Sequence, residues 1–110
     1  KVNPLHIETR LQSHPALNGA LVFGWDHTKC GILLEPKDSE ITRNALIDEV
    51  WPALDSANAL VPEHARINRD LIVVGTPQKP FQRASKGTIV RSLTTNDYKS
   101  EIEGVYRGAA

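Results

Sequence analysis

Two apolar runs, separated by a short polar stretch, place the strongest constraint on how this 110-residue chain folds. The first run is LNGALVFG at residues 17–24, and the second is CGILLEP at residues 30–36. Runs of this length that are rich in branched aliphatic residues predict strands, and the DHTK sequence between them predicts a turn. Because the apolar residues are continuous rather than alternating, both faces of this hairpin are expected to be buried.

Helical patterns flank the predicted hairpin. Asn3-Pro4 predicts the start of a first helix, which His14-Pro15 should end. A long helix should follow the hairpin with Asp38 or Ser39 as its cap, and Pro52 should either kink that helix or split it in two. The apolar face of the long helix would carry Leu46, Val50, Leu54, Ala57 and Val61.

A third strand and a closing helix complete the expected fold. LIVVG at residues 71–75 predicts a short strand, and TNDYKSEIEGVY at residues 95–106 predicts a helix with Tyr98 and Ile102 on one side. Trp51 is expected to pack rather than to bind a ligand. The order of elements predicts an α+β fold of one domain, in which helices cover a small, mostly antiparallel three-stranded sheet.

The composition excludes several classes of protein. Thirteen Lys and Arg balance thirteen Asp and Glu, so the chain as a whole has no electrostatic preference for nucleic acid. No apolar run approaches the roughly 18–20 residues that span a membrane. The single cysteine, Cys30, fits a reducing compartment and is expected to be a buried structural thiol. We therefore expect a cytoplasmic protein with no nucleic-acid or membrane partner.

Two further features concern metals and chain organisation. The four histidines lack the spacing of metal ligands, so no metal site is expected at His6, His14, His27 or His64. The chain opens at Lys1 on a helix entry and contains no Met, which is the pattern expected of a domain excised from a larger protein.

The most unusual charge pattern is KPFQRASKGTIVR at residues 79–91, called the basic segment below. It lies between Asp70 and Asp97, and residues 71–96 contain neither Asp nor Glu. Such a segment predicts either an anionic partner or a solvated basic loop. Its cations are Lys79, Arg83, Lys86 and Arg91.

Three chemistries could use this segment. A nucleotide-hydrolase phosphate loop is excluded, because it requires glycine where this chain has Pro80 and Ser85. Nucleic acid is disfavoured by the zero net charge and by Phe81 being the one nearby side chain that could stack on a base. A single catalytic Lys86 fits better, on a loop stiffened by prolines and turned by Gly87. Its ammonium could enter another domain's active site and neutralise charge on a phosphoryl or carboxylate group.

The basic segment resembles a known motif. PFQRASKGTIVR is similar to the final motif of adenylate-forming enzymes, the superfamily of acyl-CoA synthetases, luciferases and peptide-synthetase adenylation domains. Pro80, Lys86 and Arg91 match the Pro, Lys and Arg of that motif. Ser85 replaces its Gly and leaves the Lys in register.

Other stretches resemble the C-terminal subdomain of the same superfamily. ALVPEHARI matches the preceding motif through Val61-Pro62, although His64 and Ala65 replace an aromatic–Met pair. KVNPLHIETRLQSHPAL resembles the segment after the family's hinge, and Gly24 stands where the family has a strand-terminal Gly. The resemblance covers nearly the whole chain. It is strongest to fungal adenylation domains of peptide-synthetase-like enzymes and carboxylate reductases.

The resemblance implies that residues 1–108 are the mobile C-terminal cap of a multidomain adenylate-forming ligase. The complete enzyme would join a small carboxylic acid to ATP, with Mg²⁺, and pass the acyl group to phosphopantetheine on a downstream carrier domain. The cap would work against the N-terminal adenylation subdomain of the same chain. Alone, it would bind none of these cofactors and would be inactive.

Within the cap, the resemblance implies that Lys86 is the catalytic residue. Gly24 and Trp25 would line the tunnel for the thiol after the cap rotates, although Gly24 could equally be an ordinary turn and Trp25 a packing residue. The loop near the substrate and ATP would include Arg83, Ser85, Gly87 and Arg91.

Plainer interpretations of the cations stay open. Lys79 and Arg83 would be solvated or docking side chains, and Arg91 would anchor the loop or pair with Glu101 or Glu103 of the closing helix. The whole chain could also be a non-catalytic α+β interaction module with a basic docking loop.

Overall fold

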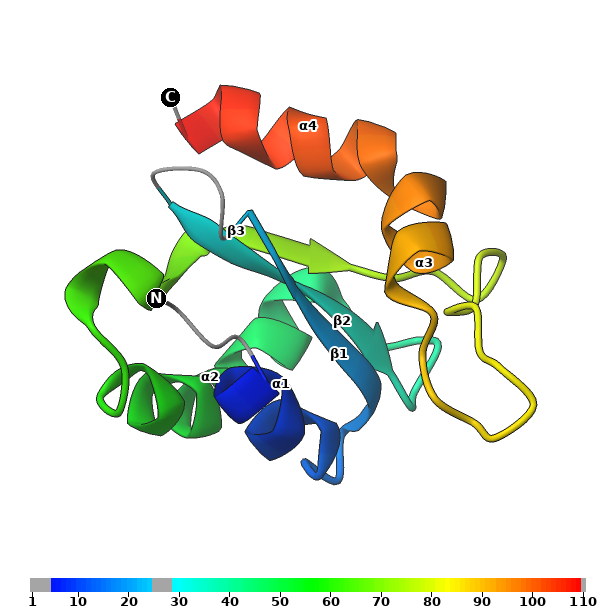
Figure 1. Ribbon diagram of the computed structural model, residues 1–110, viewed down its shortest axis with the longest axis horizontal. Coiled ribbons are helices and arrows are strands. Elements are labelled where there is room, and N and C mark those ends of the chain that lie inside the picture. The colour runs from blue at the N-terminus through cyan, green and yellow to red at the C-terminus, as the bar shows by residue number, and fades with distance from the viewer. Residues whose placement is uncertain (1–4, 25–28, 110) are drawn as a thin grey trace.

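The computed structural model describes residues 5–24 and 29–109, which form one three-stranded sheet and the helices that cover it (Figure 1). The sheet order is β1-β2-β3. In chain order the elements are α1 (Leu5–Gln12), β1 (Leu17–Phe23), β2 (Cys30–Pro36), α2 (Arg43–Asn58), a short 3-10 helix at Glu63–Ala65, β3 (Ile67–Val74), α3 (Arg91–Asp97) and α4 (Lys99–Ala109).

The sheet is mixed. β1 and β2 pair antiparallel, with Leu21 opposite Leu33, as the predicted hairpin requires. β2 and β3 pair parallel, with Leu33 opposite Val73, because α2 carries the chain back to the end of the sheet where β2 began. The α+β class and the three strands are confirmed, and the antiparallel pairing holds for β1 and β2.

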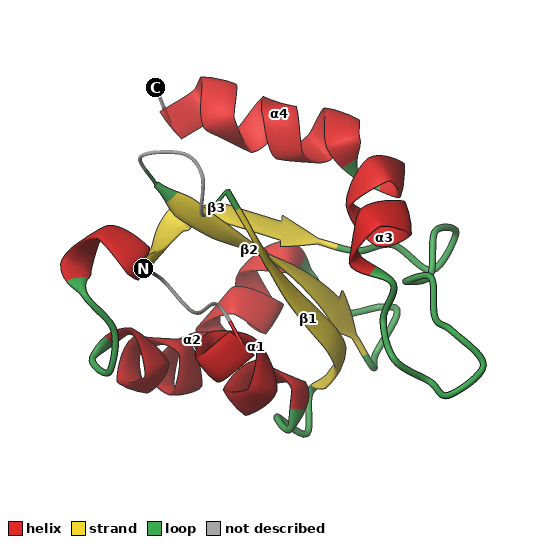
Figure 2. Cartoon of the chain, viewed as in Figure 1, coloured by secondary structure: helices red, strands yellow, loops and turns green. Residues whose placement is uncertain are grey.

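Both faces of the sheet are buried, as the continuous apolar runs predict. Figure 2 shows α1 and α2 on one side of the sheet and α3 and α4 on the other. Alternate residues of β2 serve the two sides: Ile32 and Leu34 join the cluster under α1 and α2, whereas Leu33 joins the cluster under α4. That second cluster comprises Leu21, Phe23, Leu33, Val73, Phe81 and Tyr98.

The long helix differs from the prediction at its start. α2 begins at Arg43, and Thr42 caps it by accepting a hydrogen bond from the Ala45 N–H at 3.2 Å. Asp38 instead closes a turn, accepting from the Glu40 N–H at 2.9 Å, so neither Asp38 nor Ser39 is the helix cap. The four predicted apolar positions from Leu46 to Ala57 are buried.

Pro52 lies inside α2, which is continuous from Arg43 to Asn58. Of the two predicted alternatives, the split into two helices is therefore wrong. A proline here removes one hydrogen bond, to the carbonyl of Asp48, on the exposed side of the helix, where water can replace it. Val61, which is predicted to share the apolar face, lies beyond the end of the helix.

Two other boundaries differ from the predictions. β3 begins at Ile67, ahead of the predicted residue 71, since three polar residues at 68–70 interrupt the apolar pattern. The closing helix is two helices that meet at Tyr98, whose buried ring ends α3 and packs under the sheet. The predicted helix start at Asn3-Pro4 and the prediction for Trp25 lie outside the described residues.

The predicted packing of two side chains is confirmed. Cys30 is buried, and Trp51 is half-buried against the core beneath α2, where the Arg69 guanidinium lies 4.9 Å from its ring centre. Within residues 5–24 and 29–109, no helix is both long and apolar enough to cross a bilayer. The same residues contain no group of three His, Cys, Asp or Glu arranged to hold a metal.

Candidate functional site

The basic segment lies in the connection from the end of β3 to the start of α3, on the side of the sheet that carries α3 and α4 (Figure 1). Its one apolar ring, Phe81, is buried and meets the Tyr98 ring edge-on, with centroids 6.0 Å apart. The segment therefore has a fixed position on the domain.

Lys79 is fastened to α4. Its Nζ lies 2.5 Å from Glu101 Oε2 and 2.9 Å from the carbonyl of Asp97, and it sits 4.3 Å from the centre of the Tyr98 ring. The hydrogen bond from Lys79 holds the pKa of the Glu101 carboxyl below its usual value. The stability from this pair is therefore present at neutral pH and is lost in acid, as the pH falls through the lowered pKa.

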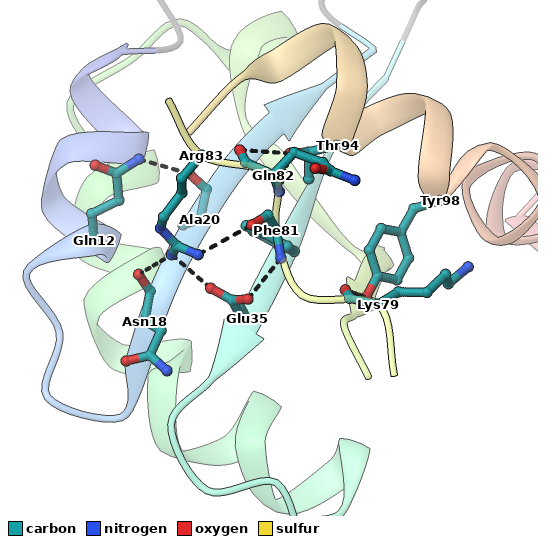
Figure 3. Close-up of polar contacts among 10 residues, drawn as sticks. All are labelled: Gln12, Asn18, Ala20, Glu35, Lys79, Phe81, Gln82, Arg83, Thr94 and Tyr98. Atoms are coloured by element: carbon teal, nitrogen blue, oxygen red, sulfur yellow. Dashed lines mark hydrogen bonds and ion pairs between the residues drawn. The ribbon is translucent and has the colours of Figure 1, made fainter. Parts of the chain in front are cut away.

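Arg83 is fastened to the sheet (Figure 3). Its Nη2 donates to Glu35 Oε1 at 2.7 Å and to the carbonyl of Asn18 at 2.9 Å. The other oxygen of Glu35 accepts from the Phe81 N–H at 2.8 Å. Acids from α4 and β2 therefore hold Lys79 and Arg83, although Arg83 stays exposed, and the prediction that the two are solvated or docking side chains rather than catalytic ones stays a prediction.

Arg91 is fastened to α1 and β1. Its Nη2 lies 2.6 Å from Glu8 Oε1, and its Nη1 donates to the carbonyl of Val22 at 2.9 Å. Glu8 is nearly fully buried, and its second oxygen accepts from the Val22 N–H at 2.8 Å. The prediction that Arg91 anchors the loop by pairing with an acid is confirmed, but the acid is on α1 rather than on the closing helix.

Lys86 lies in a tight turn, called the Lys86 turn and formed by residues 84–88. The Gly87 N–H donates to the carbonyl of Ala84 at 2.8 Å, and the Ala84 N–H donates to the carbonyl of Thr88 at 2.9 Å. Gly87 has a φ of +87°, which a residue with a side chain rarely adopts. No other type of residue in the described chain has a positive φ, so Ser85 needs no glycine-like backbone.

The four cations therefore divide three to one. Lys79, Arg83 and Arg91 each pair with a carboxylate from outside the segment. Lys86 is exposed, and its ammonium makes no hydrogen bond or ion pair with any residue that the structure describes. The segment itself contains no acid, and acids on other elements neutralise three of its cations. The positive charge of Lys86 remains at the tip of the turn.

An open hollow of about 540 Å³ adjoins the turn, and the predicted catalytic Lys86 lies around it with three of the predicted loop residues: Arg83, Gly87 and Arg91. Ser85 belongs to the turn but not to this lining. A second, larger groove of about 1020 Å³ runs between the end of β1 and α4, and Gly24 lies on it with Phe23 and Tyr106. Arg91 borders both hollows.

Position 24 requires glycine both for its backbone conformation and for its packing. Its φ is +77°, and a Cβ added there would lie 1.7 Å from the hydroxyl of Tyr106, which donates to the carbonyl of Lys29 at 2.8 Å. These contacts explain the glycine at the strand end without a ligand. A role for Gly24 in a thiol tunnel stays a prediction, and Trp25 lies outside the described residues.

Replacing Gly24 by Ala should lower the free energy of unfolding by about 2 kcal/mol, because the new methyl group strains the backbone and displaces Tyr106. Urea denaturation of the natural and variant chains measures the change. Gly104→Ala is the matched control: a Cβ on Gly104 meets no atom within 4 Å, and α4 favours alanine. Equal stability of the two variants would contradict the packing role of Gly24.

Sequence reasoning missed the acids that hold the basic segment. Glu8 follows the buried Ile7 in a short helix, and Glu35 falls within the apolar run CGILLEP. An acid at a position that periodicity assigns to a buried face is a signal for a paired carboxylate. That signal could have identified both residues, although it could not have named their partners.

Comparison with known proteins places the chain in a family. The AMP-binding enzyme C-terminal domain family matches residues 1–110. A carboxylic acid reductase from Neurospora crassa is 41% identical over 112 residues, which cover 99% of this chain and 11% of that protein. An adenylate-forming reductase from Serpula lacrymans is 32% identical and is matched over 97% of this chain and 10% of its own length. The chain thus spans about a tenth of these relatives.

A solved structure has the same fold. The A domain of carboxylic acid reductase from Segniliparus rugosus, in complex with AMP and a co-purified carboxylic acid, matches with a TM-score of 0.72 at 16% sequence identity. The match covers 99% of this chain and 18% of that one. The chain belongs to the AMP-binding enzyme C-terminal domains of adenylate-forming enzymes, and fungal carboxylic acid reductases and adenylate-forming reductases are among its relatives.

Proposed function

We propose that residues 1–108 are the mobile cap of a larger ATP-dependent enzyme that activates a carboxylic acid, and that Lys86 is its catalytic residue. One observation carries the proposal: three cations of the basic segment are paired within the domain, whereas Lys86 projects without a partner among the described residues. A fixed segment with one free ammonium at its tip is suited to completing a site that a second domain builds.

In acyl-adenylate formation, this ammonium would stabilise the negative charge of the transition state. As a carboxylate attacks the α-phosphate of ATP and the bond to the departing pyrophosphate breaks, two negatively charged groups approach each other and charge builds on the oxygens at phosphorus. A cation delivered from outside stabilises that arrangement more than it stabilises the separate reactants. Arg83 and Arg91 are already engaged by Glu35 and Glu8, which leaves Lys86 to supply this charge.

The N-terminal subdomain of the same protein would hold ATP, Mg²⁺ and the acid. The names of the relatives, carboxylic acid reductase and adenylate-forming reductase, support a carboxylic acid as the substrate. AMP and a carboxylic acid in the similar A domain support a nucleotide at the facing site. In a second step the cap would rotate, withdraw Lys86 and present the groove beside Gly24 to a phosphopantetheine thiol on a carrier domain.

The alternative of a basic docking module has less support. A docking loop needs several cations available to its partner, and three of the four here are neutralised by Glu101, Glu35 and Glu8. One remaining charge is too little for electrostatic docking at physiological salt.

Amine labelling tests whether Lys86 enters an active site. The complete enzyme is reductively methylated with and without its carboxylic acid and an ATP analogue that cannot release pyrophosphate, which together hold it before adenylation, and mass spectrometry follows the peptides of Lys86 and Lys37. We expect the analogue to protect Lys86, because the closed cap buries its ammonium. Lys37, an exposed lysine after β2, should react at an unchanged rate. Equal labelling of Lys86 in both samples would contradict the proposal.

A further inference from the structure

Glu35 stands out among the acids that hold the basic segment. It lies on β2 on the same face as Leu33, two residues away, where the chain pattern would place an apolar side chain. Both of its carboxylate oxygens are used, one by the Arg83 guanidinium at 2.7 Å and one by the Phe81 N–H at 2.8 Å (Figure 3). Its side chain is 14% exposed, so water competes little for these bonds.

The two groups that Glu35 holds form the base of the Lys86 turn. Arg83 pairs with Ile89 across an antiparallel bridge, and the Val90 N–H donates to the carbonyl of Gln82 at 2.7 Å. Lys86 follows Arg83 by three positions, a reach of at most about 10 Å. A small rotation of this base on the sheet therefore displaces the Lys86 ammonium at least as far as it displaces the base itself.

The base also rests directly on the backbone of β1. A Cβ added to Gly19 would lie 3.0 Å from the side chains of Ile89 and Phe81 and 3.1 Å from Arg83 Nη2. The pairing of β1 with β2 shifts register between Leu17 and Gly19, next to the Asn18 carbonyl that accepts from Arg83. The sheet thus contacts the base of the turn in two ways, by close packing on Gly19 and by the ion pair with Glu35.

The other two ion pairs hold different parts of the segment. The Lys79–Glu101 pair fixes its beginning against α4, and the Arg91–Glu8 pair fixes its end against α1. Glu35 is the acid that contacts the residues leading into the Lys86 turn, at the Phe81 N–H and the Arg83 guanidinium.

We propose that Glu35 is a positioning residue for Lys86: it clamps the base of the Lys86 turn to β2 and thereby sets where the ammonium reaches. The inference rests on the proposed function of Lys86. A reacting cation displaced by about 1 Å loses on the order of 10²-fold in rate, so the precision of this clamp bears on the first half-reaction. Transfer to the thiol, with Lys86 withdrawn, does not depend on it.

The test measures both half-reactions of the complete enzyme with Glu35→Gln. Gln keeps the shape of the side chain but loses the charge and one acceptor, so the bonds to Arg83 and Phe81 cannot both persist. Acyl-adenylate formation should slow by about 10- to 100-fold through kcat, while thioester formation from preformed acyl-adenylate stays at the natural rate. Glu49→Gln, an exposed acid of α2, is the matched control and should change neither step.

A double variant separates positioning from a purely structural effect. In a Lys86→Ala background, Glu35→Gln should cause no further loss of adenylation, because Glu35 acts through the missing ammonium. A further loss there, an equal loss in both half-reactions, or a natural rate in Glu35→Gln alone would overturn the inference. If Glu35→Gln does not fold, Glu35→Asp, which keeps the charge but withdraws it by one methylene, is measured in the same way.

The two proposals fail in different ways. A slow Lys86→Ala enzyme with a natural Glu35→Gln enzyme would overturn the positioning role and leave the proposed function in place. A natural rate of adenylation in Lys86→Ala would overturn the proposed function, and the positioning role with it.

Discussion

Acyl-adenylate formation by the complete enzyme should slow by about 10²- to 10³-fold when Lys86 is replaced by Ala. The estimate follows from removing one well-placed cation from a site where charge develops, a loss of roughly 3–4 kcal/mol of transition-state stabilisation. The Lys86 ammonium has no described partner within its own domain, so no internal pair is broken and the fold should be unaffected. Pyrophosphate release in a single turnover measures the step.

Two further variants make this result specific. Lys37→Ala removes another exposed lysine and should leave adenylation within about threefold of the natural rate. Lys86→Arg keeps the charge but has a different reach and a planar head group, so it should recover part of the rate. Adenylation by Lys86→Ala at the rate of Lys37→Ala would show that the cation at the tip takes no part in the reaction.

The free energy of unfolding should fall by about 3 kcal/mol when Glu8 is replaced by Ala. Glu8 is 3% exposed, and its two oxygens serve the Arg91 guanidinium and the Val22 N–H. The substitution removes the carboxylate that the Arg91 guanidinium and the Val22 N–H share, so the buried Val22 N–H loses its acceptor, and it also leaves a cavity between α1 and β1. Urea denaturation of the chain gives the change directly.

An exposed ion pair serves as the comparison for Glu8. Asp48 lies 2.7 Å from Arg69, but the two side chains are 73% and 46% exposed. Asp48→Ala should therefore cost no more than about 0.5 kcal/mol. Similar losses in the two variants would show that the contact of Glu8 with Arg91 contributes no more than a surface pair.

Much of the fold could be predicted because its signals are local. The continuous apolar runs at 17–24 and 30–36 predict buried strands, and the spacing from Leu46 to Ala57 predicts the buried face of α2. The direction of β3 could not be predicted, since pairing depends on where α2 returns the chain. Thr42 and Asp38 are both residue types that cap helices, and the path of the loop decides between them.

The candidate site divides in the same way. The exposed Lys86 and the turn at Gly87 follow from glycine and proline chemistry, which acts within a few residues. The partners of the other cations are separated from them by 22, 48 and 83 residues, for Lys79, Arg83 and Arg91 respectively. No local sequence pattern connects residues that far apart. Only the folded structure therefore distinguishes a solvated basic loop from one held by ion pairs.

The most direct measurement concerns the second half-reaction in the same Lys86→Ala preparation. Preformed acyl-adenylate is supplied to the complete enzyme with its carrier domain, and the rate of thioester formation is compared with that of adenylation. If Lys86 serves adenylation and is then withdrawn, thioester formation should remain within about threefold of the natural rate while adenylation collapses. An equal loss in both half-reactions, or a loss in neither, would contradict the role proposed for Lys86.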